Sequence, residues 1–409
     1  MRQAMDFNKM RAHRRRGIFL KRFFILAAIV AAVFVVMSLN TFLVAWQFPT
    51  QVTGFLQGFG GPGFPIQVPG GVLRDVKALG NDVAVLNDSN LFLYNRNGRE
   101  LLSVQRMNEN TILLARGSRL LTYSNGSRSF QIHFQGRLLL DTDHTNPIIS
   151  AALGERGNYA LVSSPMQHAS EVLVFSEQFE LLFEWSTHEL VVLVDLDPRG
   201  GGMAAGSVGA RDGELRSTVS LFDMTTTNDP TQVEFRDELI LALEYLDHTR
   251  LAVITDKGLR VINATTGQMI DSYNIQSGRI SLSRISGDYI LLFEEDPQYR
   301  LMTAILFDGR GRELGRAELE AGARDMQVSE RGVYILTPVG VERFDHAMNP
   351  RGKVDRSGIH HILLAGNILY YFTAEEIGIL GQDSWEPEAP ESRLGDAAPD
   401  RRITLTNAE

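Results

Sequence analysis

The stretch LFLYNRNGRELLSV (91–104) shows the pattern on which most of this chain is built. An apolar run is followed by a short turn containing Asn and Gly and then by a second apolar run, which predicts a β-hairpin. Gly98 supplies the positive φ that such a turn requires. Four more stretches follow the same scheme, with Gly267 and Gly311 at the turns of two of them: 172–185, 259–273, 304–319 and 341–354.

A second pattern, a turn followed by an apolar strand, alternates with the first; LGNDVAVL (79–86) and ISGDYILLF (285–293) are examples. One pattern of each kind occupies about 40 residues and supplies four short strands, which is typical of a β-propeller blade. We expect blades near 73–105, 108–144, 147–187, 190–236, 239–276, 279–320 and 323–356, and an eighth unit at 359–381.

The eighth unit contains only three recognisable strands, HHILLAG, NILYYFT and EEIGILG. Residues 66–68 are the candidate for its fourth strand, because a strand from the other end of the chain would close the ring and protect the last sheet edge. The predicted fold class is therefore all-β: a β-propeller over residues 72–382, with eight blades as the first choice and seven as the alternative.

A single transmembrane helix is predicted before the propeller, over the uncharged run 23–46, FFILAAIVAAVFVVMSLNTFLVAW. At 1.5 Å per residue this run reaches roughly 36 Å, enough to cross a hydrocarbon core of about 30 Å. Trp46 falls where an interfacial aromatic belt would lie. A cleaved signal peptide is the alternative, but its apolar region normally spans only about 7–15 residues.

The residues before this run predict its orientation. Eight of the first 22 residues are basic and one is acidic, and the basic residues closest to the run are Arg14, Arg15, Arg16, Lys21 and Arg22. By the positive-inside rule, residues 1–22 form a basic cytoplasmic tail and the rest of the chain lies outside the cytoplasm. We therefore expect a single-pass protein of the cell membrane.

Two segments flank the predicted propeller. Residues 47–71 are rich in Gly and Pro and are interpreted as a linker; Gly58, Gly60 and Gly63 match the dinucleotide-binding pattern, but no strand precedes them and Pro follows where a helix should begin. Residues 383–409 are acidic and rich in Pro, which predicts a disordered tail.

Composition excludes several classes of function. The 409 residues carry a net charge of -9; eight of the 40 basic residues and one of the 49 acidic residues lie in 1–22, which leaves 32 against 48, or -16, for the rest. Residues 23–409 are therefore strongly acidic, which argues against binding to nucleic acid. The chain has no Cys, so it forms no disulfide and has no thiolate site.

The hairpins NGRELL (97–102) and RGRELG (310–315) resemble those of quinoprotein-like and WD40-like propellers. The layout as a whole resembles an uncharacterised family of bacterial, clostridial-type, single-pass membrane proteins with an extracytoplasmic propeller domain of unknown function. This resemblance implies a propeller and no activity. Only Trp185 of the three Trp residues lies in a blade, and the cysteine pair of quinoprotein dehydrogenases is missing, so no quinone cofactor is expected.

No catalytic motif emerges from the residues. Gly206-Ser207-Val208-Gly209 lacks the frame of a nucleophile elbow and is interpreted as a small-residue loop between strands. Glu294-Glu295-Asp296 is interpreted as a charged hairpin tip at the surface. No general acid–base pair can be named, because the loops of a propeller bring together residues that are far apart in the sequence.

No metal site is predicted either. His360 and His361 are adjacent in a strand and should project to opposite faces. The acids of Asp141-Thr142-Asp143-His144 would share one face and could bind a hard cation, but a solvated turn explains them as well. The run from Asp195 to Gly200 has Arg199 at a ligand position of a calcium loop, and no Glu closes that loop.

We therefore expect a membrane-anchored extracytoplasmic binding or scaffold module without catalytic, cofactor or metal residues, whose partner is an envelope protein or polymer. One alternative is an envelope-acting hydrolase or lyase with its site in the propeller mouth. The other is a sensor subunit, which would need a membrane partner because 22 cytoplasmic residues are too few for a folded output domain.

Overall fold

The computed structural model describes residues 61–68, 70–105, 110–211, 213–276, 278–298, 301–319, 322–381 and 384–385. The predicted membrane span 23–46, its flanking basic residues and Trp46 lie outside these ranges, as do Gly58 and Gly60. Within the described part of the chain, no helix of the length and apolar character required to cross a membrane is found.

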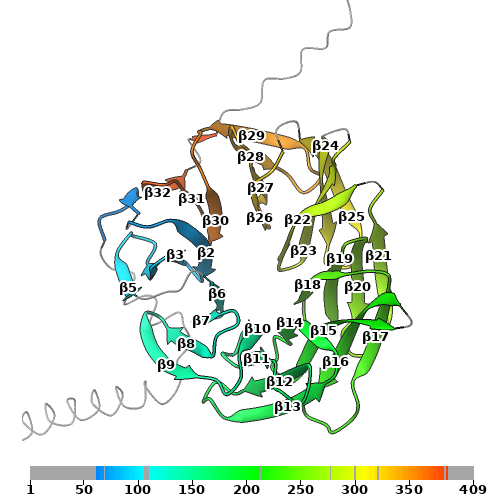
Figure 1. Ribbon diagram of the computed structural model, residues 1–409. Coiled ribbons are helices and arrows are strands. Elements are labelled where there is room, and N and C mark those ends of the chain that lie inside the picture. The colour runs from blue at the N-terminus through cyan, green and yellow to red at the C-terminus, as the bar shows by residue number, and fades with distance from the viewer. Residues whose placement is uncertain are drawn as a thin grey trace, which may run out of the picture. The chain divides into compact units, whose positions relative to one another are not determined.

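The described residues form eight antiparallel sheets of four strands, which follow one another around a ring (Figure 1). The prediction of an all-β propeller with eight blades is confirmed, and the alternative of seven is wrong. Within each blade the strands pair in chain order, except in the last blade, and the first strand lies nearest the centre of the ring (Figure 1).

The strands of blades 1 to 4 are β2 (Leu73–Leu79), β3 (Asp82–Asn87), β4 (Asn90–Tyr94) and β5 (Glu100–Gln105); β6 (Thr111–Arg116), β7 (Arg119–Ser124), β8 (Ser129–Phe134) and β9 (Arg137–Asp143); β10 (Ile148–Leu153), β11 (Tyr159–Ser163), β12 (Ser170–Phe175) and β13 (Leu181–Thr187); and β14 (Leu190–Leu196), β15 (Gly202–Arg211), β16 (Glu214–Asp223) and β17 (Thr231–Arg236).

The strands of blades 5 to 8 are β18 (Ile240–Tyr245), β19 (Arg250–Thr255), β20 (Gly258–Asn263) and β21 (Met269–Asn274); β22 (Arg279–Ser286), β23 (Tyr289–Asp296), β24 (Leu301–Asp308) and β25 (Glu313–Leu319); β26 (Asp325–Ser329), β27 (Gly332–Leu336), β28 (Gly340–Phe344) and β29 (Pro350–Asp355); and β30 (His361–Ala365), β31 (Ile368–Phe372), β32 (Glu376–Leu380) and β1 (Ile66–Gln67).

The ring is closed by the first described strand. β1 pairs antiparallel with β32, with Ile66 opposite Ile377, and the backbone N–H of Val68 donates to the carbonyl of Glu375 at 2.8 Å. The predicted contribution of residues 66–68 to the last blade is confirmed. Closure covers an edge that would otherwise expose unpaired backbone groups.

The repeated hairpin turn has a common hydrogen-bonding scheme. In the turn after β4, the Asn95 side-chain oxygen accepts from the backbone N–H groups of Asn97 and Arg99, both at 2.9 Å, and Gly98 adopts φ 75°. Asp308 accepts in the same way from Arg310 and Arg312, with φ 88° at Gly311. A short polar side chain that caps its own turn explains why the NxxG and DxxG patterns recur.

The core lies between neighbouring blades, because alternate residues of a strand face opposite sides of its sheet. In blade 6, Phe293 of β23 packs with Met326 and Val328 of blade 7, whereas Phe307 of β24 packs with Ile254 of blade 5. The second strands of the blades are therefore almost wholly buried and the third strands mostly so, whereas the fourth strands are largely exposed, with partly buried positions at intervals.

The connections divide the propeller into two faces. The turns from the first to the second strand and from the third to the fourth strand of each blade lie on one face, here called the turn face. The connections from the second to the third strand and from blade to blade lie on the opposite face, here called the loop face. This division follows from the antiparallel order of the strands.

Candidate functional site

Two predictions from the sequence are wrong: the loop at 206–209 and the surface position of Glu294. Ser207 does not lie in a loop but in β15, where it is 1% exposed and its hydroxyl donates to a carboxylate oxygen of Glu189. A β carbon at Gly206 would make only an ordinary van der Waals contact, 3.5 Å from the β carbon of Leu193. Glu294 is not at a surface tip: it is 8% exposed and accepts from the Tyr273 hydroxyl at 2.7 Å.

The His and Asp candidates stay apart. His360 is exposed, whereas His361 lies with Nδ1 3.4 Å from an Asp325 carboxylate oxygen, consistent with opposite faces of the strand. Asp141 and Asp143 are exposed on β9. Among the described residues, no group of three or more His, Asp or Glu side chains is arranged to hold a metal ion.

One Ser–His–Glu contact superficially suggests a hydrolase. His144 Nε2 lies 3.2 Å from the Ser163 hydroxyl, which donates to Glu171 at 3.4 Å. The carboxylate thus contacts the Ser rather than orienting the His, and Ser163 is completely buried. Burial lowers the pKa of His144, although Glu171 opposes this. The order of contacts is not that of an activated nucleophile.

The residues that meet at the centre of the turn face were not found from the sequence. Arg116, the last residue of β6, donates to Asp195 of β14 at 2.7 Å, to Glu244 of β18 at 2.9 Å and to Glu155 at 3.2 Å. One guanidinium of blade 2 therefore reaches blades 3, 4 and 5. We call these four residues the central ion cluster.

The central ion cluster is held tightly on its Asp195 side. Asp195 is 5% exposed, and its second carboxylate oxygen accepts from the backbone N–H of Tyr245 in the next blade at 2.8 Å. Burial raises the pKa of Asp195, whereas Arg116 lowers it. Burial also raises the pKa of Glu244 to about 7, with Asp195 adding to the rise and Arg116 opposing it.

A similar contact links blades 6, 7 and 8. Arg284 of β22 donates to the Met326 carbonyl at 3.3 Å and approaches Asp325 at 3.5 Å, and the second oxygen of Asp325 accepts from the Ile362 N–H at 3.1 Å. Asp195 and Asp325 thus each accept from the backbone of the next blade. These contacts fix the innermost strands relative to one another, so the structure explains them without catalysis.

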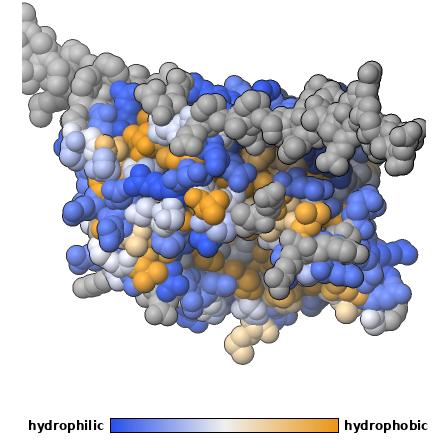
Figure 2. Space-filling view, turned by 90° about the horizontal axis from the view of Figure 1, so that it is seen from above, coloured by the Kyte–Doolittle hydropathy of each residue, from blue (hydrophilic) through white to orange (hydrophobic). Residues whose placement is uncertain are grey.

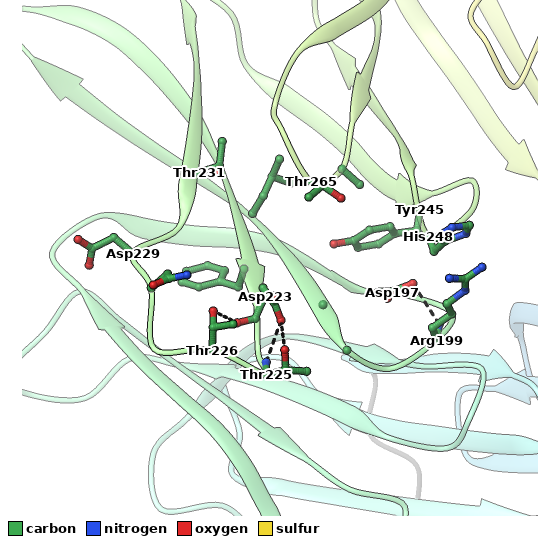
Figure 3. A pocket seen from close by; sticks show the side chains of 16 residues that line it. Asp197, Arg199, Asp223, Thr225, Thr226, Asp229, Thr231, Tyr245, His248 and Thr265 are labelled. Atoms are coloured by element: carbon green, nitrogen blue, oxygen red, sulfur yellow. Dashed lines mark hydrogen bonds between the residues drawn. The ribbon is translucent and has the colours of Figure 1, made fainter.

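A groove opens on the turn face between blades 4 and 5 (Figure 3). Its volume is about 520 Å³, within the ~300–1,000 Å³ usual for small-molecule sites. Four turns supply its walls: those between β14 and β15, β16 and β17, β18 and β19, and β20 and β21. Its polar and aromatic lining includes Asp197, Arg199, Phe222, Asp223, Thr225, Thr226, Asn228, Asp229, Thr231, Tyr245, His248 and Thr265.

The loop face differs in character. Of the sixteen large apolar side chains that are exposed among the described residues, eight lie in loop-face connections or within two residues of them: Val72, Met166, Leu190, Leu215, Leu239, Leu241, Leu301 and Val339. Of the other eight, six lie on fourth strands within two residues of turn-face connections: Leu138, Leu181, Leu182, Met269, Ile270 and Leu314. Leu139 lies further along β9, and Ile379 lies near the end of β32. Figure 2, an edge-on view, shows hydrophobic patches among hydrophilic residues at the rim.

Residues 71–349 match a family described as a family of unknown function, DUF5711. The chain belongs to this family. The resemblance to a family without assigned function is thereby confirmed, whereas bacterial origin and a single membrane span stay predictions. Among curated proteins, no relative of the chain is found.

Several solved structures are similar to this chain. The β-propeller domain of Cps50 (Swd1) from Myceliophteria thermophila is 14% identical, with a TM-score of 0.43, and the match covers 77% of this chain and 97% of that domain. The WD40 domain of Neurospora crassa Pan2 is 8% identical, with a TM-score of 0.48 and coverage of 77% and 93%. A chain of a mitotic checkpoint complex is 11% identical, with a TM-score of 0.45 and coverage of 80% and 91%.

Proposed function

We propose that this protein is a membrane-anchored binding module whose loop face docks on a protein of the cell envelope. The observation that carries this proposal is the uneven distribution of exposed apolar side chains. Four, Val72, Met166, Leu239 and Val339, lie within loop-face connections, and the described turn-face connections contain none. Propellers commonly serve as binding or scaffold modules, but that analogy of fold is secondary here.

The loop-face residues suit a protein partner better than a polysaccharide. Met166 projects fully into solvent, and Val72 and Val339 are 63% and 57% exposed. Exposed apolar side chains can fill apolar pockets of a protein partner, and a small share of the residues at an interface carries most of its affinity. A polysaccharide offers few apolar pockets for them, so a protein is the occupant proposed.

Site-specific photo-crosslinking in intact cells tests the binding role. A photoreactive residue in place of Met166 or Leu239 should give discrete crosslinked proteins, and one in place of Glu330, in a turn-face connection, should not. Crosslinking of the same strength from Glu330, or no crosslinks from either loop-face position, would refute the proposal. Polymer-sized smears from the loop face alone would indicate an envelope polymer in place of a protein.

The topology of the anchor is testable separately because the chain has no Cys. A single Cys at exposed Ser357 should react with a membrane-impermeant maleimide in intact cells, whereas a Cys at Gln3 should react only after lysis. Reaction of both in intact cells, or of neither, contradicts the proposed orientation. This follows from the basic tail 1–22 and the apolar run 23–46.

A further inference from the structure

The groove between blades 4 and 5 is lined by a largely buried tyrosine whose hydroxyl has no described hydrogen-bond partner. Tyr245, at the end of β18, is 5% exposed and lines the groove. Figure 3 shows its ring extending into the space between the turns that bear Asp197, Asp223 and Thr265. Within the described residues, no group is hydrogen-bonded to its hydroxyl, although buried hydroxyls normally have a partner.

The backbone opposite leaves room beside this hydroxyl. Gly202 begins β15, and a β carbon added there would lie 3.5 Å from the Tyr245 oxygen, 3.3 Å from the β carbon of Asp197 and 3.2 Å from the Phe222 carbonyl. A larger residue would therefore occupy the space next to the hydroxyl. Burial raises the pKa of Tyr245 above its ordinary value, with Asp195 and Asp197 adding to the rise, so the phenol remains a hydrogen-bond donor.

The walls of the groove supply acceptors in fixed positions. Asp223 Oδ1 accepts from the Thr225 N–H at 2.9 Å and from the Thr225 hydroxyl at 2.6 Å, and these bonds lower the pKa of Asp223. Asp197 Oδ1 accepts from the Arg199 N–H at 3.0 Å. In each case the bonds hold the carboxylate in place through one oxygen, and the other oxygen is available to a ligand.

Charge and polarity narrow the class of ligand. Asp197, Asp223 and Asp229 line the groove against one guanidinium, that of Arg199, so an anion would be repelled. Four Thr hydroxyls, at 225, 226, 231 and 265, add groups that both donate and accept. The aromatic rings of Phe222 and Tyr245 are largely buried, so the groove offers little exposed apolar surface to an apolar ligand.

We propose that the turn-face groove between blades 4 and 5 is a binding site for a saccharide without acidic groups, with Tyr245 as its buried hydrogen-bond donor. Sugar hydroxyls donate to the fixed carboxylates of Asp197 and Asp223 and accept from the phenol, so both kinds of groove group are satisfied. The site lies on the face opposite the proposed protein interface and does not depend on it.

The test is isothermal titration calorimetry, in which three tetrasaccharides are titrated into the full-length protein. The protein is purified without sugar-based detergent. Chitotetraose is neutral, its de-N-acetylated form is cationic and tetragalacturonic acid is anionic. We expect saturable binding of the neutral or the cationic probe, or of both, and none of the anionic one. Stronger binding of the anionic probe, or no binding of any of them in the millimolar range, overturns the proposal.

Tyr245→Phe removes only the hydroxyl and should weaken binding about fivefold, the equivalent of one hydrogen bond of about 1 kcal/mol. Tyr370→Phe is the matched control, because Tyr370 lies in blade 8, away from the groove, and its buried hydroxyl also lacks a described partner. Equal affinities for Tyr245→Phe and Tyr370→Phe would overturn the role of Tyr245. Binding of spermidine in place of all three saccharides would assign the groove to an amine and refute the saccharide.

Discussion

The two faces of this propeller are built from the ends of the same strands, yet they expose different chemistry. The turn face has the central ion cluster and a polar groove, and none of its described connections exposes a large apolar side chain. The loop-face connections expose four such side chains: Val72, Met166, Leu239 and Val339. The two faces therefore differ in the chemistry of their connections, although the same strands support both.

The ion pairs of the central ion cluster hold the blades together, in contrast to the exposed ion pairs at the loop face. Asp195 is buried, and its pair with Arg116 joins blade 4 to blade 2. The pair of Lys257 with Asp237, at 2.7 Å, is largely exposed. Buried and exposed pairs differ because only the buried carboxylate has lost its water.

The largest expected effect comes from Arg116→Ala. It leaves Asp195 charged and buried without its partner, which should cost about 3–5 kcal/mol of unfolding free energy. Urea denaturation followed by circular dichroism measures this. Lys257→Ala, the exposed counterpart, should leave the stability nearly unchanged, because water and salt screen its pair with Asp237. If the two variants were equally stable, the contrast between buried and exposed ion pairs would fail.

The second prediction concerns the loop face. Replacement of Leu239 and Leu241 by Ser should weaken binding to the crosslinked partner by about tenfold or more, because interface anchors contribute roughly 1–2 kcal/mol each. The same change at Leu138 and Leu139, exposed to a similar degree on the rim, should leave affinity unchanged. Surface plasmon resonance with the identified partner compares them, and loss of affinity in the rim variant would show that exposure alone decides binding.

The smallest expected effect is a pH dependence from Glu244. Because its pKa is raised to about 7 in the folded protein, the folded state binds more protons than the unfolded state between about pH 5 and about pH 7. This contribution to stability is complete below the unfolded pKa and is lost as the pH rises through 7. Stability should therefore fall over that range, and less steeply in Glu244→Gln.

Urea unfolding at several pH values gives this slope. The pKa of Asp195 is also raised, so Glu244→Gln should reduce the slope without abolishing it. Glu155→Gln, at the half-exposed end of the cluster, should retain the wild-type dependence. An unchanged slope in Glu244→Gln would mean that the cluster does not bury this carboxylate in solution.

Local sequence determined most of the fold. The alternation of apolar strands with Asn, Asp and Gly turns defined eight blades, because each hairpin is specified by residues a few positions apart, as Asn95 and Gly98 illustrate. The candidate for ring closure at 66–68 could be identified as well, since a three-stranded last unit requires a fourth strand. The interpretation of Gly206 to Gly209 as a loop was wrong because runs of small residues also occur within strands, here in β15.

Only the tertiary structure decided where the chemistry lies. Arg116 and Glu244 are 128 residues apart and meet because both end innermost strands on one face of the ring, and no local pattern marks either. Tyr245 belongs to an ordinary apolar strand in the sequence, and its place in a polar groove depends on turns from two blades. A propeller assembles its surfaces from equivalent ends of successive blades, so sequence spacing determines the blade and ring geometry determines its neighbours.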